Sequence, residues 1–169
     1  IAHVHVDSWR STYAGMLPET MLLRLSSTRK ETRWWGSILA SPRRRHYIYV
    51  AEDGEEGVIG VASGGPSRDR ELREEGEIYA LYLLDHFHGI GVGKALFLAL
   101  AERLQRDSGK SLVVWVLKAN PSRFFYEAMG GRRTATRLER MGDVEVESIA
   151  YGWESLPESV PHDRSRYGS

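Results

Sequence analysis

The stretch EIYALYLLDHFHGIGVGKALFLALAERL, residues Glu77–Leu104, decides the fold of this chain. Its first part, Glu77–Leu84, is rich in β-forming and apolar residues, which predicts a central strand. Its last part belongs to the segment Gly91–Arg106, where leucine recurs at every fourth position, and this predicts an amphipathic helix. A glycine-rich turn joins the two, so this region is predicted to be strand, turn and helix.

Further strands and helices are predicted on both sides of this unit. The strands cover His46–Asp53, Val58–Ser63, Ser111–Leu117, Arg132–Met141 and Val144–Trp153. The helices run from Ile1 to Gly15, over Pro18–Leu25, from a cap at Ser27 or Thr28 to Leu39, and over Pro121–Met129. The order strand, helix, strand over residues 77–117 implies a right-handed parallel crossover, whereas turns at Gly54–Gly57 and Gly142–Asp143 make hairpins. The sequence therefore predicts a mixed α/β sheet.

The composition is that of a cysteine-free chain of ordinary domain size with no net charge. Its 169 residues balance 23 lysines and arginines against 23 aspartates and glutamates. Zero net charge argues against nucleic-acid and membrane-surface binding, and the lack of cysteine excludes disulfides and a thiol nucleophile. We expect a cytoplasmic protein with one domain, residues 1–156, and a poorly packed tail, residues 157–169. Because the first helix begins at once, we also expect residues upstream of Ile1 to be missing.

The turn HGIGVGK, residues His88–Lys94, is the first candidate functional motif. Free backbone N–H groups at a helix start attract anions, and glycine lets phosphate oxygens approach the backbone. The spacing G-x-G-x-G is not the dinucleotide fingerprint G-x-G-x-x-G. It is not a P-loop either, because His88 stands in place of the first glycine and Ala95 in place of Ser or Thr. The turn is therefore either a phosphate site of another kind or a connection that binds nothing.

A second motif, NPSRFFYEAMGG, spans Asn120–Gly131 after the next predicted buried strand. Asn120 is suited to cap the following helix, and Tyr126 is suited to the core, where its hydroxyl would need a partner. Neither residue is diagnostic alone. Two H-x-H pairs elsewhere in the chain lack a third ligand at a suitable spacing, so we expect no metal.

Together the two motifs resemble those of the GNAT N-acetyltransferases. The family's Q/R-x-x-G-x-G/A loop is similar to His88–Gly93, and its N-P-A-R-x-F-Y-E-x-x-G segment is similar to Asn120–Gly130. The opening and closing segments also resemble family members, so the likeness spans about residues 1–155. His88 departs from the family's Gln or Arg, and the family's N-terminal strand is missing. The resemblance implies a mixed, mostly antiparallel sheet of six to seven strands flanked by helices.

The family transfers an acetyl group directly from acetyl-coenzyme A to an amine, and the resemblance implies where the coenzyme binds. The pyrophosphate would lie on the glycine turn, and the pantetheine arm would lie beside the central strand like an extra strand. The implied coenzyme-binding residues are Leu81, Leu83, His88, Gly89, Gly91, Val92, Gly93, Lys94 and Asn120. The amide of Leu81 would face the thioester oxygen and stabilise the tetrahedral oxyanion.

The resemblance also implies two catalytic residues, Glu77 and Tyr126. An alkylammonium group has a pKa of about 10.4 and must lose a proton before it attacks. Glu77 is the implied base, acting directly or through water, and Tyr126 is the implied general acid for the departing thiolate. The alternatives are a solvent-facing glutamate at a strand edge and a core tyrosine.

The acceptor pocket is expected between the first two helices and the first hairpin. Trp9, Tyr13 and Tyr79 are the candidate lining residues, with a place in the core as their alternative. We expect an N-acetyltransferase for a small amine, for example a polyamine, or for a peptide amine. The alternative function is a non-catalytic regulatory module that binds acyl-coenzyme A on the same fold. The exposed final hairpin is compatible with a homodimer.

Overall fold

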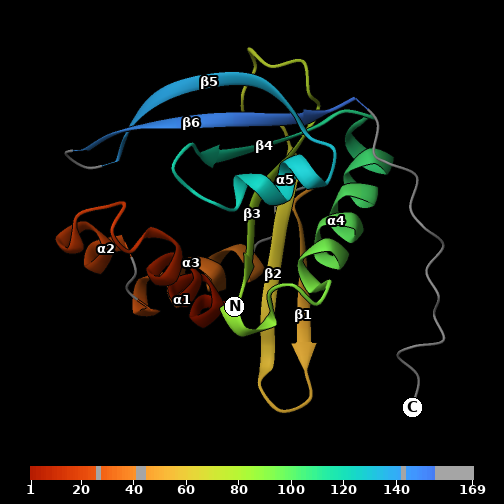
Figure 1. The fold of residues 1–169 in the computed structure, drawn as a ribbon. Coiled ribbons are helices and arrows are strands. Elements are labelled where there is room, and N and C mark those ends of the chain that lie inside the picture. Colours follow the sequence, from red (N-terminus) through yellow and green to blue (C-terminus); the bar gives the residue numbers. More distant parts are fainter. Residues whose placement is uncertain (26–27, 41–44, 142–143, 155–169) are drawn as a thin grey trace.

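The computed structural model contains a six-stranded sheet with helices on both faces (Figure 1). It describes residues 1–25, 28–40, 45–141 and 144–154. The strands lie in the order β1-β2-β3-β4-β6-β5, and every neighbouring pair is antiparallel except β3 and β4. This confirms the predicted mixed, mostly antiparallel sheet flanked by helices.

The strands follow the β-forming runs of the sequence. They are β1 (Tyr47–Asp53), β2 (Gly57–Pro66), β3 (Gly76–Leu83), β4 (Leu112–Leu117), β5 (Arg132–Met141) and β6 (Val144–Trp153). Val, Ile, Tyr and Leu dominate β3 and β4, as expected for strands inside a sheet. The turn between β1 and β2 is held by Asp53, whose Oδ1 accepts the amides of Glu55 (2.8 Å) and Glu56 (3.1 Å).

The helices cover the two faces of the sheet. They are α1 (Ala2–Tyr13), α2 (Glu19–Leu25), α3 (Thr28–Ala40), α4 (Val92–Ser108) and α5 (Arg123–Ala128), with a 3₁₀ turn at Asp85–Phe87. α4 packs across β1 to β4 on one face, and α1 packs with α3 on the other face (Figure 1). The leucine stripe predicted for α4 is the side that packs on the sheet, since Leu96, Leu100 and Leu104 are all buried.

β2 separates two hydrophobic cores because its side chains alternate between the faces of the sheet. Ala62 belongs to the core under α4, whereas Ile59 and Val61 belong to the core under α1 and α3. The helix lies very close to the strand at Gly60, where a Cβ atom would come within 2.8 Å of the Leu96 side chain. A side chain at this position would push α4 away from the sheet.

The parallel pairing of β3 with β4 is short, and this shapes the site described below. Only residues 76–78 of β3 pair with residues 112–114 of β4. Beyond Ile78, β3 continues to Leu83 with β2 as its one strand partner among the described residues. β4 likewise continues to Leu117 beside β6 alone. The two strands diverge beyond Ile78 and Val114, and the gap between their unpaired halves is called the wedge. Each strand leaves an open backbone edge toward it.

The predicted elements differ from the observed ones mainly at their ends. β2 continues past the predicted end at Ser63 to Pro66, because pairing with β3 outweighs the weak β-propensity of the two glycines between them. The 3₁₀ turn after β3 is absent from the sequence prediction. The predicted tail 157–169, the turn Gly142–Asp143 and the cap Ser27 lie outside the described residues. Within the described ranges, no helix has both the length and the apolar character to cross a membrane.

Candidate active site

A cavity of about 950 Å³ occupies the wedge between β3 and β4. Its walls come from the diverging halves of these strands, the start of α4, α5, one face of α1 and the cavity-facing side of β5. This volume suits a cofactor-sized ligand. The backbone edges left open by the two strands, and the first turns of the helices that follow them, therefore meet around one space.

The glycine turn presents unused backbone amides to this cavity. Gly89 and Gly91 have φ angles of 77° and 95°, which favour glycine, and a Cβ atom at either position would meet nothing within 4 Å. α4 has no side-chain cap, and no hydrogen bond within the described part of the chain engages the amides of Val92, Gly93 or Lys94. An open turn with free amides at a helix start is suited to bind an anion.

Most of the residues predicted to bind the coenzyme line this cavity. They are Leu81, Leu83, His88, Gly89, Gly91, Gly93, Lys94 and Asn120, whereas Val92 is not a lining residue. The His88 ring turns back toward β3, because its Nε2 lies 3.0 Å from the Leu83 carbonyl oxygen. The Ser8 hydroxyl donates to the same oxygen at 3.1 Å. One strand position predicted to pair with the pantetheine arm is thus hydrogen-bonded by this chain's own side chains.

A chain of hydrogen bonds and ring contacts joins Asn120 to the wall formed by α1. Asn120 Oδ1 accepts the amide of Ser122 at 2.8 Å, and its Nδ2 donates to the Tyr13 hydroxyl at 3.3 Å. Tyr13 packs against Trp9 with 4.7 Å between ring centroids, and the Trp9 indole donates to the Tyr82 hydroxyl at 3.0 Å. Trp9, Tyr13 and Tyr82 all line the cavity. Asn120 is therefore not the N-cap of α5, which is Ser122 and has no side-chain cap, but its side chain holds the turn before this helix and orients an aromatic wall.

Tyr126 is buried in α5, yet it lines the cavity. Its ring packs against Phe125 and Trp153, and its hydroxyl has no hydrogen-bond partner among the described residues. Burial raises the pKa of Tyr126, and the neighbouring Tyr82 and Tyr13 add to this rise. The phenol therefore keeps its proton at neutral pH and has it available to donate.

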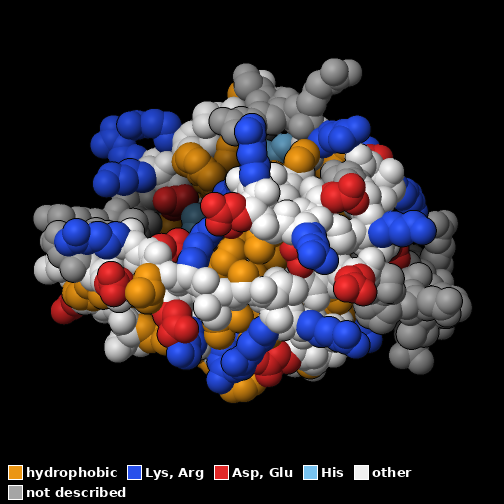
Figure 2. Space-filling view, turned by 90° about the horizontal axis from the view of Figure 1, so that it is seen from above, with side chains coloured by type: hydrophobic (Ala, Val, Ile, Leu, Met, Phe, Trp, Pro, Cys, Tyr) orange, Lys and Arg blue, Asp and Glu red, His pale blue; other side chains and the backbone are white. Residues whose placement is uncertain are grey.

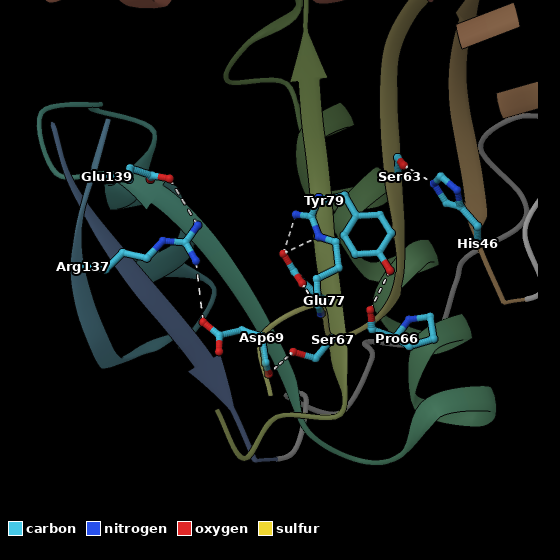
Figure 3. Close-up of polar contacts among 10 residues, drawn as sticks. His46, Ser63, Pro66, Ser67, Asp69, Glu77, Tyr79, Arg137 and Glu139 are labelled. Carbon is cyan, nitrogen blue, oxygen red and sulfur yellow. Dashed lines mark hydrogen bonds and ion pairs between the residues drawn. The ribbon is translucent and has the colours of Figure 1, made fainter. Parts of the chain in front are cut away.

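Glu77 lies at the closed end of the wedge and is not a lining residue. It is 2% exposed, so it is not a solvent-facing glutamate. The backbone amide of Arg68 donates to its Oε2 at 2.7 Å, and the Arg68 side chain donates to its Oε1 from Nε (3.1 Å) and Nη2 (2.6 Å). The same guanidinium lies 4.2 Å from the ring centroid of Tyr79, whose hydroxyl donates to the Pro66 carbonyl at 2.6 Å (Figure 3). Tyr79 does line the cavity, so Glu77 is close to it but covered.

Among the lining residues that carry no signal in the sequence motifs are Trp115, Arg137, Glu139 and Ser148. Arg137 and Glu139 are two positions apart on β5 and share a face, and Ser148 pairs with Arg137 across the hairpin. Arg137 Nη2 lies 3.4 Å from Glu139 Oε2 (Figure 3). Alternation along residues 132–141 is the signal that could have marked this face, but the sequence does not tell which face meets the cavity.

Charged side chains of both signs lie on the face of the molecule drawn in Figure 2. Seen from above, basic and acidic side chains are intermixed around an apolar centre (Figure 2). Within the described ranges, histidine, aspartate and glutamate side chains do not gather in a group of three that could hold a metal ion. The cavity in the wedge is the candidate active site.

The comparison with protein families agrees with this geometry. Residues 7–130 match the Acetyltransferase (GNAT) family. The chain belongs to this family. The predicted resemblance is confirmed, and so is the predicted enzyme class: this GNAT protein is an acyltransferase of the acetyl-coenzyme-A-dependent, N-acetyltransferase type.

Relatives of this GNAT protein are found at the level of sequence and of structure. It is 36% identical over 156 residues to the uncharacterized N-acetyltransferase YuaI of Bacillus subtilis (strain 168). The matched region covers 92% of this chain and 87% of YuaI. The structure resembles the ribosomal-protein-alanine N-acetyltransferase of Brucella melitensis (TM-score 0.64, 18% identity, 90% of each chain). It also resembles PaiA N-acetyltransferase from Thermoplasma acidophilum in complex with coenzyme A (TM-score 0.61, 18% identity, 88% of each chain). The two structural likenesses support the GNAT fold.

His5 supports the aromatic wall of the cavity from behind. Its ring stacks on Tyr82 with 4.4 Å between centroids, and the Trp35 indole donates to its Nδ1 at 3.2 Å. Glu31 Oε2 lies 3.0 Å from the same nitrogen, but burial lowers the pKa of His5 from 6.5 to about 4 and raises the pKa of Glu31. His5 is therefore neutral at pH 7, and its contact with Glu31 is not an ion pair there.

We predict that His5 makes the fold sensitive to mild acid. The unfolded chain protonates this ring below about pH 6.5 and the folded chain only near pH 4, so the free energy of unfolding falls as pH is lowered through this window. The loss attributable to His5 is at most about 3 kcal/mol. Urea unfolding at pH 7 and pH 4.5 should show a smaller loss in His5→Gln than in the wild type.

The control for this prediction is His3→Gln, because His3 is an exposed histidine of the same helix. Its urea midpoints should follow the wild type at both pH values. Equal acid sensitivity in His5→Gln and wild type would show that the buried ring does not cause the loss. Glu31 titrates in all three proteins and in the opposite sense, so the comparison between proteins isolates the histidine.

Proposed function

We propose that this protein transfers the acetyl group of acetyl-coenzyme A to the primary amine of a small molecule, without an acyl-enzyme intermediate. The observation that carries the proposal is the wedge, in which the open edge of β3 runs beside a turn with free amides. A diphosphate suits the turn, and an extended arm suits the strand edge. The free hydroxyl of Tyr126 lines the same cavity.

The coenzyme is proposed to bind with its diphosphate on the glycine turn. The backbone amides from Gly89 to Lys94 donate hydrogen bonds to the phosphate oxygens, and the Lys94 side chain adds a positive charge. The pantetheine arm lies along β3 as an extra strand, with Leu81 and Asn120 as hydrogen-bond partners. The Leu83 carbonyl also accepts a hydrogen bond from the arm once its hydrogen bond with His88 is broken. The His88 ring is then free to turn toward the phosphates.

Tyr126 is proposed as the general acid. The amine nitrogen attacks the thioester carbonyl carbon, and the oxygen of the tetrahedral intermediate takes a negative charge that the Leu81 amide stabilises by about 2.7–4 kcal/mol. When the intermediate collapses, the carbon–sulfur bond breaks and the Tyr126 hydroxyl gives its proton to the sulfur. The nitrogen of the new amide loses its remaining extra proton, which returns through water to the Tyr126 phenolate and restores the general acid. The raised pKa and the lack of a partner for this hydroxyl support the role, because the proton is present and uncommitted.

Glu77 is proposed as the base. The ammonium group of the acceptor loses a proton before it attacks, and a carboxylate at the closed end of the wedge is suited to accept it. Because Glu77 lies behind Tyr79 and is not a lining residue, the proton would reach it through water. Arg68 holds this carboxylate in place through hydrogen bonds from its backbone amide and its guanidinium.

Titration calorimetry with acetyl-coenzyme A and a thiol-release assay over a panel of amines test the proposed function. We expect the coenzyme to bind, and we expect thiol release that depends on a primary amine. Binding without release on any amine would favour a non-catalytic acyl-coenzyme-A-binding module. Absence of binding would contradict both functions.

Tyr126→Phe is predicted to lower kcat by about 10²–10⁴-fold, because the leaving thiolate is no longer protonated in the active site. The Kd for acetyl-coenzyme A should change little, since the ring still fills its place. Steady-state thiol release and titration calorimetry measure the two effects. Tyr49→Phe on β1, outside the cavity lining, is the matched control and should keep wild-type turnover. Equal turnover in Tyr126→Phe and wild type would remove the assignment.

Glu77→Gln is predicted to lower kcat/KM at pH 7 by about 10²-fold, because no carboxylate remains to take the proton of the acceptor. The loss should shrink as the pH approaches the amine pKa, where the neutral amine is already abundant. A pH profile of thiol release from pH 7 to 10 measures this. Glu71→Gln in the neighbouring loop should follow the wild type. A loss that stays constant with pH would mean that Glu77 has a structural role only.

A further inference from the structure

The cavity holds one carboxylate that the proposed mechanism does not use. Glu139 lies on β5 with its side chain 35% exposed, and it lines the cavity together with Tyr13 and Trp115. The other acidic lining residue among those described is Asp85. It lies in the 3₁₀ turn before the glycine turn and accepts the Ser11 hydroxyl at 3.0 Å. Of these two lining carboxylates, Glu139 is the one whose charge acts on Tyr13.

The charges around Glu139 do not balance. Arg137 Nη2 lies 3.4 Å from Glu139 Oε2, and Arg137 Nη1 lies 3.6 Å from Asp69 Oδ2, so two carboxylates share one guanidinium (Figure 3). The Ser148 hydroxyl donates to Glu139 Oε1, and the Arg137 guanidinium lies over the Trp115 ring at 4.0 Å. The cluster of Arg137, Asp69 and Glu139 therefore carries one net negative charge, and these contacts fix the position of the Glu139 carboxylate.

This charge reaches the aromatic wall formed by α1. Burial raises the pKa of Tyr13, and the negative charge of Glu139 adds to the rise. Tyr13 in turn packs against Trp9, so a carboxylate and two aromatic rings border the same part of the cavity. A carboxylate beside aromatic rings binds alkylammonium groups through charge and through cation–π attraction.

We propose that Glu139 determines acceptor specificity by binding a second, non-reacting ammonium group, so that straight-chain diamines are the preferred acceptors. The inference rests on the proposed function and narrows its acceptor class. The chain's own guanidinium, Arg137, already shows that this carboxylate attracts a cation. The diamine would bring a second cation to a cluster whose net charge is negative.

The ammonium group at Glu139 is the non-reacting nitrogen of the diamine, for two reasons. The reacting nitrogen must be neutral when it attacks. A carboxylate in direct contact with this nitrogen would favour its protonated, ammonium form, whereas Glu77 is proposed to act through water. Glu139 also lies on β5, three strands from β3 in the sheet order, so the two groups stand on different walls of the cavity. An alkyl chain can bridge the two places, with one nitrogen toward Leu81 and the other at Glu139.

The test compares diamines with monoamines on the wild-type protein and on Glu139→Gln. Terminal diaminobutane, diaminohexane and diaminooctane are assayed by thiol release against butylamine, hexylamine and octylamine. In the wild type, the best diamine should have a KM at least about tenfold below that of the monoamine of equal length. Glu139→Gln should lose this preference, so that the KM values of diamine and monoamine become equal.

Two control variants separate the effect of the Glu139 charge from an effect on the fold of the hairpin. Glu139→Asp retains the carboxylate and should keep part of the diamine preference. Glu147→Gln removes a carboxylate of the same hairpin that pairs with Lys118 instead, and its preference should match the wild type. Thermal melting of each variant shows whether the hairpin is intact.

Calorimetric titration of diaminohexane and hexylamine into the wild-type protein saturated with coenzyme A gives a readout without turnover or mutation. Tighter binding of the diamine is expected. Equal binding, or an equal loss of both substrates in Glu139→Gln, would overturn the role of Glu139 and leave the acetyltransferase function standing. A preference for aminohexanoate over diaminohexane would also overturn it, because Arg137 would then bind the remote group. Failure of every amine in every assay would overturn the proposed function as well.

Discussion

The short parallel contact between β3 and β4 is the constraint on which the site depends. Only residues 76–78 and 112–114 pair, and beyond them the strands separate. Since the strands are parallel, the segments that follow them emerge at the same side of the sheet. One is the glycine turn that starts α4, and the other is the Asn120 turn that precedes α5. An open strand edge, free amides and a buried phenol therefore surround one cavity without any long loop to assemble them.

The sequence predicts the parts of the site that are local in the chain. The glycine turn and the Asn120–Gly131 motif carry their structure in their own residues, through positive φ angles and the hydrogen bond from the Ser122 amide to the Asn120 side chain. The sheet follows from β-forming runs and the turns between them. Trp9, Tyr13 and Tyr79 are also found at the cavity, although aromatic residues at such spacing are equally typical of a core.

The β5 wall could not be predicted, because it depends on contacts between distant segments. Whether Arg137 and Glu139 face the cavity or the solvent is set by the register of β5 on β6, which shifts between Arg133 and Ala135. The burial of Glu77 depends on Arg68, whose loop folds back over the end of β3. Two glutamates on strands of one sheet thus have different environments, one enclosed by an arginine and one open to the cavity.

The contact of Asp69 with Arg137 also ties the loop between β2 and β3 to β5. A loop next to β3 and a cavity-lining strand at the edge of the sheet are therefore joined by one ion pair. Because Arg137 also contacts Glu139 and the Trp115 ring, a change in that loop acts on the wall of the cavity.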